Sequence, residues 1–408
     1  MKKKLVTART KKAAPLYDRI RQILESARTG IARTVNTTQV VTNWLIGREI
    51  VEEEQAGGKK AGYGDQLLKE LADSLTEEYG AGYSGTNLRW FRQFYLEYDS
   101  LLPGKIYHAV RDKSEAGSSA RIHHAVRGKS DALSQKLPPE IDLSIMQIGN
   151  TVRDQSWQPG LLHPNLSWTH YRTMLKVDKP EARSFYEIEA IKNNWSAREL
   201  ERQINSLLYE RLALSKDKKG LMRLATKGHE VQKPEDVFKD PVIMEFLGLP
   251  ETPKLVETDL EQALINNLQS FLLELGKGFA FVARQERLTL DGDHFYIDLV
   301  FYHTILKCYV LIELKTGKLT HQDLGQLQLY VNYYDRERRT EGDNLTLGLI
   351  LCTDKNDAVV RYTLGQDQQK KIFASRYKLY LPTEAELKTE LRREIRELSG
   401  LSGKGKKS

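Results

Sequence analysis

Apolar residues in the first quarter of the chain recur every three or four positions, which is the spacing of one face of an α-helix. The pattern predicts helices over residues 17–27, 40–54 and 65–79. A turn follows at residues 80–83, and Ser84 or Thr86 can cap a fourth helix. The N-terminal part of the chain is therefore expected to be helical.

The fourth helix combines an apolar face with a basic one. Its expected buried residues are Leu88, Phe91, Tyr95 and Tyr98. Arg89 and Arg92 remain available for contacts with nucleic acid, and a helix, a glycine-containing turn and a second helix form the outline of a helix-turn-helix unit. We therefore expect a helix-turn-helix-like unit here. A helical hairpin that binds nothing has the same outline and is the alternative.

A short repeat interrupts the helical pattern. The segment IYHAVRDKS at 106–114 returns as IHHAVRGKS at 122–130, and two copies of this length are too few for a solenoid. We interpret residues 104–140 as a low-complexity insertion. Its histidines leave a metal-binding role as the alternative; they are His108, His123 and His124.

The pattern then becomes helical again and finally changes period. Ser196 and Glu199 form the sequence signature of a capping box ahead of a helix over 197–212. The C-terminal half predicts helices over 259–275, 321–338 and 384–398, and strands over 279–290, 294–302, 307–315, 345–352 and 378–381. Up to residue 352 the order is α-β-β-β-α-β, typical of a mixed sheet flanked by helices. The fold class is thus α+β overall, with an all-α N-terminal half and an α/β C-terminal domain.

These changes of pattern predict seven segments. They are a basic arm at 1–14, a helical N-terminal domain at 15–103, the insertion at 104–140, a helical continuation at 141–214, a linker and docking helix at 215–250, the α/β domain at 251–398 and a basic tail at 399–408.

Composition limits the class of protein. The 408 residues carry a net charge of +7, but the N-terminal arm holds +6 and the insertion and the tail +3 each, so the rest of the chain is at −5. Cys308 and Cys352 are the only cysteines, which excludes a disulfide scaffold and leaves buried core thiols as the simplest interpretation. No secretory signal and no membrane-length apolar run occurs, so we expect a cytoplasmic protein with no membrane partner.

Three charged residues interrupt the most apolar strands. Asp298 lies within FYIDLVFY, and Glu313 and Lys315 lie within VLIELK, where period-two geometry puts them on the same face. A charge inside a core strand is costly unless it is paired or bound to a metal. Two carboxylates and an ammonium group are the equipment for Mg²⁺-assisted hydrolysis of a phosphodiester. A buried salt bridge without catalytic function is the alternative.

Asp298 followed by Glu313-Leu314-Lys315 resembles the signature of the PD-(D/E)XK nucleases, with Ile297 at the position of the proline. Gln326 and Tyr330 resemble the Q-x-x-x-Y feature of the RecB-like branch of that superfamily. The stretches GTNLRWFRQFY, LSWTHY, NWSARELERQI, FYIDLVFY and IELKTG are similar to the YhcG family. That family pairs a winged-helix-like N-terminal domain with a PD-(D/E)XK domain of restriction-endonuclease-like fold.

The resemblance implies a function for these positions. Asp298, Glu313 and Glu261 would bind Mg²⁺, with Mn²⁺ as a substitute, and Lys315 would assist attack by water. Gln326 and Tyr330 would support the site. The implied partner is nucleic acid, DNA in preference to RNA, with a homo-oligomer or a defence-system protein as further partners. Two alternatives are a nuclease-like domain that binds without cutting and a regulator that acts through the helix-turn-helix.

Overall fold

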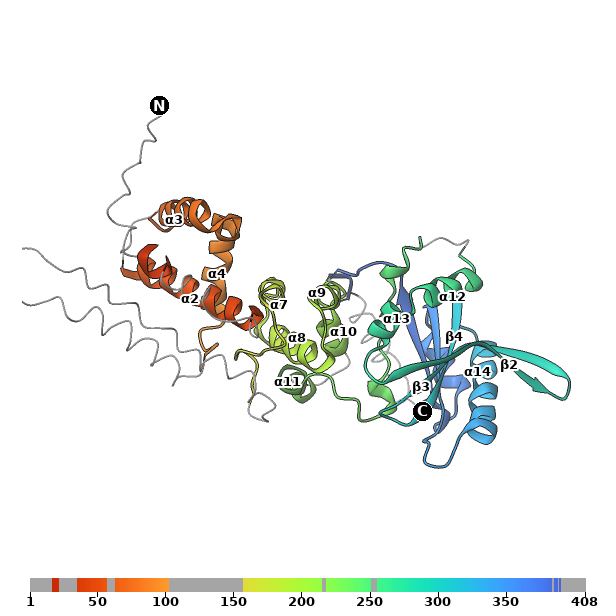
Figure 1. Cartoon of the computed structure of the whole chain (residues 1–408). Coiled ribbons are helices and arrows are strands. Elements are labelled where there is room, and N and C mark those ends of the chain that lie inside the picture. The colour runs from red at the N-terminus through yellow and green to blue at the C-terminus, as the bar shows by residue number, and fades with distance from the viewer. Residues whose placement is uncertain are drawn as a thin grey trace, which may run out of the picture. The chain divides into compact units, whose positions relative to one another are not determined.

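The computed structural model of the 408-residue chain describes residues 17–21, 35–56, 63–102, 157–214, 218–250, 255–383, 385–387 and 389 (Figure 1). The chain forms two compact units, residues 1–200 and residues 201–408. The predicted basic arm, the insertion and the basic tail lie outside the described residues, as does most of the helix predicted over 384–398. No helix within the described residues is both long and apolar enough to cross a membrane.

The first unit is helical where it is described. Its α-helices are α2 (Val35–Ala56), α3 (Tyr63–Tyr79), α4 (Gly85–Glu97), α7 (Trp168–Met174) and α8 (Pro180–Asn193), and the 3₁₀ turn η1 (Ala81–Tyr83) precedes α4. The helices predicted over 40–54 and 65–79 are confirmed, while residues 22–27 of the first predicted helix lie outside the described part. The described residues of this unit contain no strand, so they do not show the wing of the predicted winged helix.

One of the residues that α4 buries differs from the prediction. Ser84 caps the helix by accepting a hydrogen bond from the Asn87 N–H, as predicted. The buried aromatic residue of the third turn is Phe94, whereas Tyr95 is half-buried at the edge of the Trp44 ring, so the prediction for Tyr95 was wrong. Phe94 stacks with three further rings at centroid distances of 5.0–5.3 Å; they belong to Tyr98, Trp168 and Tyr171.

A glycine allows α2 and α4 to cross closely. A Cβ atom on Gly47 would lie 2.0 Å from the Phe91 carbonyl oxygen, so no larger side chain fits without moving the backbone of α4. The apolar stripe of α4 is thereby held against α2.

The helices around the start of the second unit differ from the predicted ones in number and in bounds. The helix predicted over 197–212 is two helices, α9 (Ala197–Asn205) and α10 (Leu208–Leu214), because Leu207 adopts a left-handed φ of 54° that ends the first. The predicted capping box of Ser196 and Glu199 is present. A further helix, α11 (Lys218–Lys227), lies in the segment 215–250, for which the sequence predicted a linker and a docking helix.

A six-stranded mixed sheet forms the centre of the second unit. Its order is β1 (Val242–Ile243), β6 (Ile372–Lys378), β5 (Leu347–Asp354), β4 (Cys308–Lys318), β3 (Asp293–His303) and β2 (Phe279–Leu290). The pairings of β2 with β3 and of β3 with β4 are antiparallel, and those of β4 with β5, β5 with β6 and β6 with β1 are parallel. The sequence predicted five of these strands and missed β1. It placed the last strand at 378–381, whereas β6 covers residues 372–378, because Arg376 and Lys378 obscure the apolar pattern of β6.

Helices cover both faces of this sheet (Figure 1). α12 (Glu257–Asn266) and α13 (Leu268–Leu275), predicted as one helix, break at Asn267 and pack on the face that contains Leu299, Phe301 and Ile312. α14 (His321–Tyr333), continued by a π-helical turn (Tyr334–Arg338), and the short α15 (Asp357–Thr363), which the sequence did not predict, pack on the other face. From α12 to β5, with α12 and α13 counted as one helical segment, the observed order α-β-β-β-α-β is the predicted one. Cys308 and Cys352 are buried free thiols, as expected.

Candidate active site

The site forms where β3 and β4 leave the apolar core. The pairing of the two strands runs from Leu299 opposite Ile312 to His303 opposite Cys308, so Asp298 and Glu313 lie just beyond the paired segment. The Asp298 N–H donates to Glu313 Oε1 at 3.3 Å, and the Leu314 N–H donates to Asp298 Oδ2 at 2.8 Å. The strands therefore hold these two carboxylates side by side.

Both carboxyl groups bind protons more tightly than usual. Burial, followed by the charge of Asp298, raises the pKa of Glu313 to about 8. Burial also raises the pKa of Asp298, although the Leu314 N–H, Gln285 and Lys315 act in the opposite direction. Two adjacent carboxylates with raised pKa values form a site whose ionised state is favoured by a cation.

Glu261 reaches the same place from α12. It is 5% exposed, and burial raises its pKa. The Gln285 amide donates to Glu261 Oε2 at 2.7 Å and to Asp298 Oδ1 at 3.0 Å, so a single NH₂ group joins the two acids. The other oxygen, Glu261 Oε1, is buried and makes no hydrogen bond, although Arg284 Nε lies 3.2 Å away.

Lys315 is held between two acids that the sequence did not single out. Its Nζ lies 3.3 Å from Glu257 Oε2, at the start of α12, and 3.9 Å from Asp323 Oδ1, in the first turn of α14. Burial lowers the pKa of Lys315, but Glu257, Glu313 and Asp323 together bring it above its usual value. The ammonium group thus stays charged beside Asp298 and Glu313.

The two remaining predicted residues lie on α14. The Gln326 amide donates to the Tyr330 hydroxyl at 2.6 Å, and Tyr330 is fully buried. Burial raises the pKa of Tyr330, and the charges of Glu313 and Asp298 raise it further, which places the phenol within the electrostatic reach of the carboxylates.

The two arginines predicted to contact nucleic acid lie in the first unit and differ from each other. Arg89 is exposed on α4. Arg92, one turn later, is half-buried, and its Nε donates to Glu54 Oε2 of α2 at 2.7 Å. The Arg92 side chain is still 40% exposed, so both arginines reach solvent, but the guanidinium of Arg92 is engaged in this ion pair.

The carboxylate oxygens at this site are the kind of ligand that a hard divalent cation prefers, but they do not form a complete set of ligands. Within the described ranges, no group of three or more His, Cys, Asp or Glu residues is arranged to hold a metal ion by itself. Mg²⁺ keeps several waters and is often bound through one or two carboxylates plus substrate phosphate. The adjacent pair of Asp298 and Glu313, with the unbonded Glu261 Oε1 nearby, meets that smaller requirement.

Sequence reasoning missed Gln285, Glu257 and Asp323. Gln285 is a polar residue on an exposed strand, and its position opposite Asp298 follows only from the β2–β3 register, in which Arg284 faces Leu299 and Glu286 faces Ile297. Its backbone has a left-handed φ of 46°, which is uncommon for a residue other than glycine and often marks functional sites.

Comparison with known proteins gives matches in both halves of the chain. A family model described as the YhcG PDDEXK nuclease domain matches residues 235–392, and one described as the DUF1016 N-terminal domain matches residues 19–110 and 145–211. A protein of Escherichia coli (strain K12) with the name "Putative nuclease YhcG" is 36% identical over 376 residues, which is 92% of each chain.

Two solved structures overlap the chain over a smaller part. A repair endonuclease from Pyrococcus abyssi overlaps 33% of this chain and 50% of its own, at 15% identity and a TM-score of 0.22. A complex described as "Structure of EndoMS-dsDNA2 complex" overlaps 33% and 51%, at 14% identity and a TM-score of 0.23. The fold is assigned from the sheet topology and the family models alone.

Proposed function

The chain belongs to the YhcG family, whose C-terminal part is a PDDEXK nuclease domain, and from this premise we propose that it is a divalent-metal-dependent nuclease. The proposed active site consists of Asp298, Glu313 and Lys315. The observation that carries the proposal is the adjacency of the Asp298 and Glu313 carboxylates, both with raised pKa values, beside a charged lysine. The proposed metal is Mg²⁺, with Mn²⁺ as a substitute.

Each residue has a role that its contacts support. A bound cation would polarise the scissile phosphate and activate water for attack. Asp298 and Glu313 would hold that cation, with the Leu314 N–H fixing the orientation of Asp298, and Glu261 would complete the ligand set directly or through water. Lys315 would turn from Glu257 towards the phosphoryl oxygens and stabilise their developing charge.

Supporting groups complete the proposal. The hydrogen bond between Gln326 and Tyr330 fixes both side chains at the wall of the site, where they would position the carboxylates or the substrate. In the first unit, Arg89 would contact the nucleic acid, while Arg92 serves an ion pair with Glu54. We take DNA as the preferred substrate and RNA as the alternative.

The proposal is tested by incubating the purified full-length protein with labelled single- and double-stranded DNA and RNA, in Mg²⁺, Mn²⁺ or EDTA. We expect cleavage of DNA that depends on the divalent cation. Asp298→Asn, which removes the charge and keeps the shape, should abolish this cleavage, because a neutral amide is a poor ligand for a hard cation.

Asp293→Asn is the matched control. Asp293 lies on the same strand as Asp298 but is exposed at the tip of the hairpin, so this variant should cut as the unchanged protein does. Cleavage that persists in EDTA, or in Asp298→Asn, contradicts the proposal.

A further inference from the structure

The hairpin of β2 and β3 extends beyond the segment of β3 that pairs with β4. β4 pairs with β3 only from Leu299 onwards, so residues 293–298 of β3 pair with β2 alone. Figure 1 shows this two-stranded ribbon extending past the other strands of the sheet. An isolated hairpin is marginally stable in water, so the ribbon needs support from one of its faces.

The two faces of the ribbon have different environments. Leu288 and Ile297 are buried against α14, and Phe295 packs with its ring centroid 6.4 Å from that of Tyr330. The opposite face carries four exposed residues in two cross-strand pairs. These four, here called the outer stripe, are Arg287 opposite Tyr296 and Thr289 opposite His294.

The outer stripe continues directly into the proposed active site. The β2–β3 register places Gln285 opposite Asp298, between the pairs Arg284 with Leu299 and Glu286 with Ile297. Their side chains meet there, at 3.0 Å. At about 3.4 Å per residue, the stripe runs roughly 14 Å from Asp298 to His294, which is the length of about four base pairs. An exposed hairpin face alone is ordinary; its continuity with the carboxylates distinguishes this one.

The chemistry of the outer stripe suits a nucleic acid. Arg287 supplies a cation for phosphate, and Tyr296, 47% exposed, supplies a ring that can stack or pack against sugar. Thr289 and His294 are joined at 3.1 Å and offer polar atoms to base edges. The stripe contains no acid. Asp291 and Asp293 lie at the tip of the hairpin, beyond its last pair.

We propose that the outer stripe docks the nucleic-acid duplex on one side of the bond that is cut, with the ribbon lying in a groove. The major groove of B-form DNA admits a two-stranded β-ribbon. The proposal rests on the nuclease function proposed for the same unit, and it assigns the substrate path that the active-site residues leave undefined.

Binding is measured apart from cleavage. The full-length Lys315→Ala protein is titrated in EDTA against a fluorescein-labelled 20-base-pair DNA duplex, and anisotropy gives Kd at several salt concentrations. Adding Arg287→Ala and Tyr296→Ala should weaken binding about tenfold or more, since loss of a single arginine contact to duplex DNA costs about 1–3 kcal/mol. Arg287→Ala alone should reduce the salt dependence by about one counterion.

Arg339→Ala is the matched control. This exposed arginine precedes the loop in which the Asn344 N–H bonds the Lys307 carbonyl oxygen, at the end of β4 away from Lys315. Its removal should change Kd less than twofold, and equal melting temperatures show that all variants are folded. A double variant that binds as its parent does, or a parent that binds no duplex, overturns the proposal.

The two proposals fail separately. If the unchanged protein cuts no nucleic acid while the stripe variants lose binding, the nuclease function is wrong and the docking surface stands. If the unchanged protein cuts DNA while the stripe variants bind and cut equally well, the docking surface is wrong and the nuclease function stands.

Discussion

At the residue scale, charges placed inside apolar strands were the informative signal. Asp298, Glu313 and Lys315 stand out in the sequence because ionised groups in core strands need partners, and the structure brings them together. Gln285 could not be found in this way, since an exposed polar residue on a strand is ordinary until the register across the hairpin is known. Its contacts lead to the first prediction.

Gln285→Ala should change how the protein responds to metal. Without the amide, Glu261 and Asp298 lose a shared donor and repel each other, so the metal-free melting temperature should fall. The amide also occupies carboxylate oxygens that a cation would use, so Mn²⁺ should raise the melting temperature of the variant more than that of the unchanged protein.

Gln269→Ala on α13 is the control for this experiment, because Gln269 is exposed and is not a partner in the hydrogen bonds of Glu261 and Asp298 or in the ion pair of Arg284. Differential scanning fluorimetry with EDTA and with Mn²⁺ gives both quantities. An equal metal-induced shift in Gln285→Ala and in the unchanged protein would show that the amide has no part in the cation site.

A second prediction concerns pH and the first unit. Burial raises the pKa of Glu187 in α8 to about 7, although Tyr98, the Gly160 N–H and Arg183 lower it. The folded chain thus keeps a proton that the unfolded chain loses near pH 4.5. This contribution to stability is fully present below pH 4.5 and is lost as the pH rises through 7.

The melting temperature should therefore fall between pH 5 and 8, and Glu187→Gln should reduce that fall, because its amide has no proton to lose. Glu181→Gln, an exposed residue of the same helix, is the control. Calorimetry at four pH values compares the variants, and identical slopes for both would contradict the assignment.

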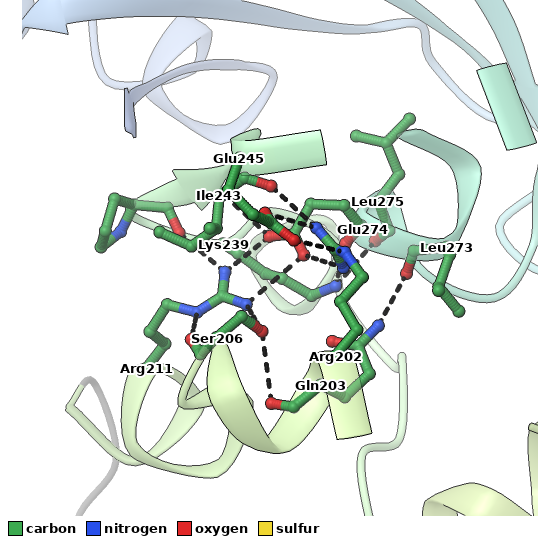
Figure 2. A network of polar contacts seen from close by, with 11 residues as sticks. Arg202, Gln203, Ser206, Arg211, Lys239, Ile243, Glu245, Leu273, Glu274 and Leu275 are labelled. Atoms are coloured by element: carbon green, nitrogen blue, oxygen red, sulfur yellow. Dashed lines mark hydrogen bonds and ion pairs between the residues drawn. The ribbon is translucent and has the colours of Figure 1, made fainter. Parts of the chain in front are cut away.

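At the scale of elements, the period of the apolar pattern predicted helices and strands well but did not locate breaks. The pattern runs on through Leu207 and Asn267, so α9 with α10, and α12 with α13, were each predicted as one helix. The break after α9 has a structural consequence. It turns α10 so that Arg202 and Arg211, on successive helices, converge on Glu274 of α13 (Figure 2).

This network lies within the second unit and is largely buried. Glu274 is fully buried, with Arg211 Nη1 at 2.6 Å and Arg202 Nη1 at 3.1 Å, and Lys239 donates to its backbone carbonyl oxygen. Burial alone would raise the pKa of Glu274, but Arg211, Lys239 and Arg202 lower it to about 2. The carboxylate is therefore ionised across the physiological pH range and joins α9 and α10 to α13.

Glu274→Ala should destabilise the protein by about 3–5 kcal/mol, because it leaves the buried guanidinium of Arg211 without its counter-charge. Urea unfolding measures the free energy. Asp367→Ala, which removes the exposed partner of Lys370, should cost about 1 kcal/mol or less. Similar losses in both variants would show that the buried pair contributes no more than a surface pair.

At the scale of the whole molecule, the unit boundary and the family models divide the chain differently. The DUF1016 N-terminal model extends to residue 211, whereas the compact second unit begins at residue 201. Arg202 and Arg211 thus match the N-terminal model but bind Glu274 in the nuclease unit. The domain boundaries predicted from composition could not reveal this, because a buried ion pair between distant segments has no local pattern.

The distribution of charge along the whole chain explains its positive net charge. The excess of +7 lies in the arm, the insertion and the tail, and the remaining residues are acidic overall. Charge therefore does not support a nucleic-acid substrate by itself, and the account depends on the local arrangement around Lys315.

Comparing the cleavage rates of two lysine variants tests that arrangement most directly. Lys315→Ala and Lys318→Ala remove lysines from the same strand, but only Lys315 lies beside the carboxylates, while Lys318 is exposed three residues later. With Mg²⁺ and labelled DNA, Lys315→Ala should lower the cleavage rate by about 10²-fold or more, and Lys318→Ala should leave it near that of the unchanged protein. Equal rates in the two variants would contradict the proposed active site.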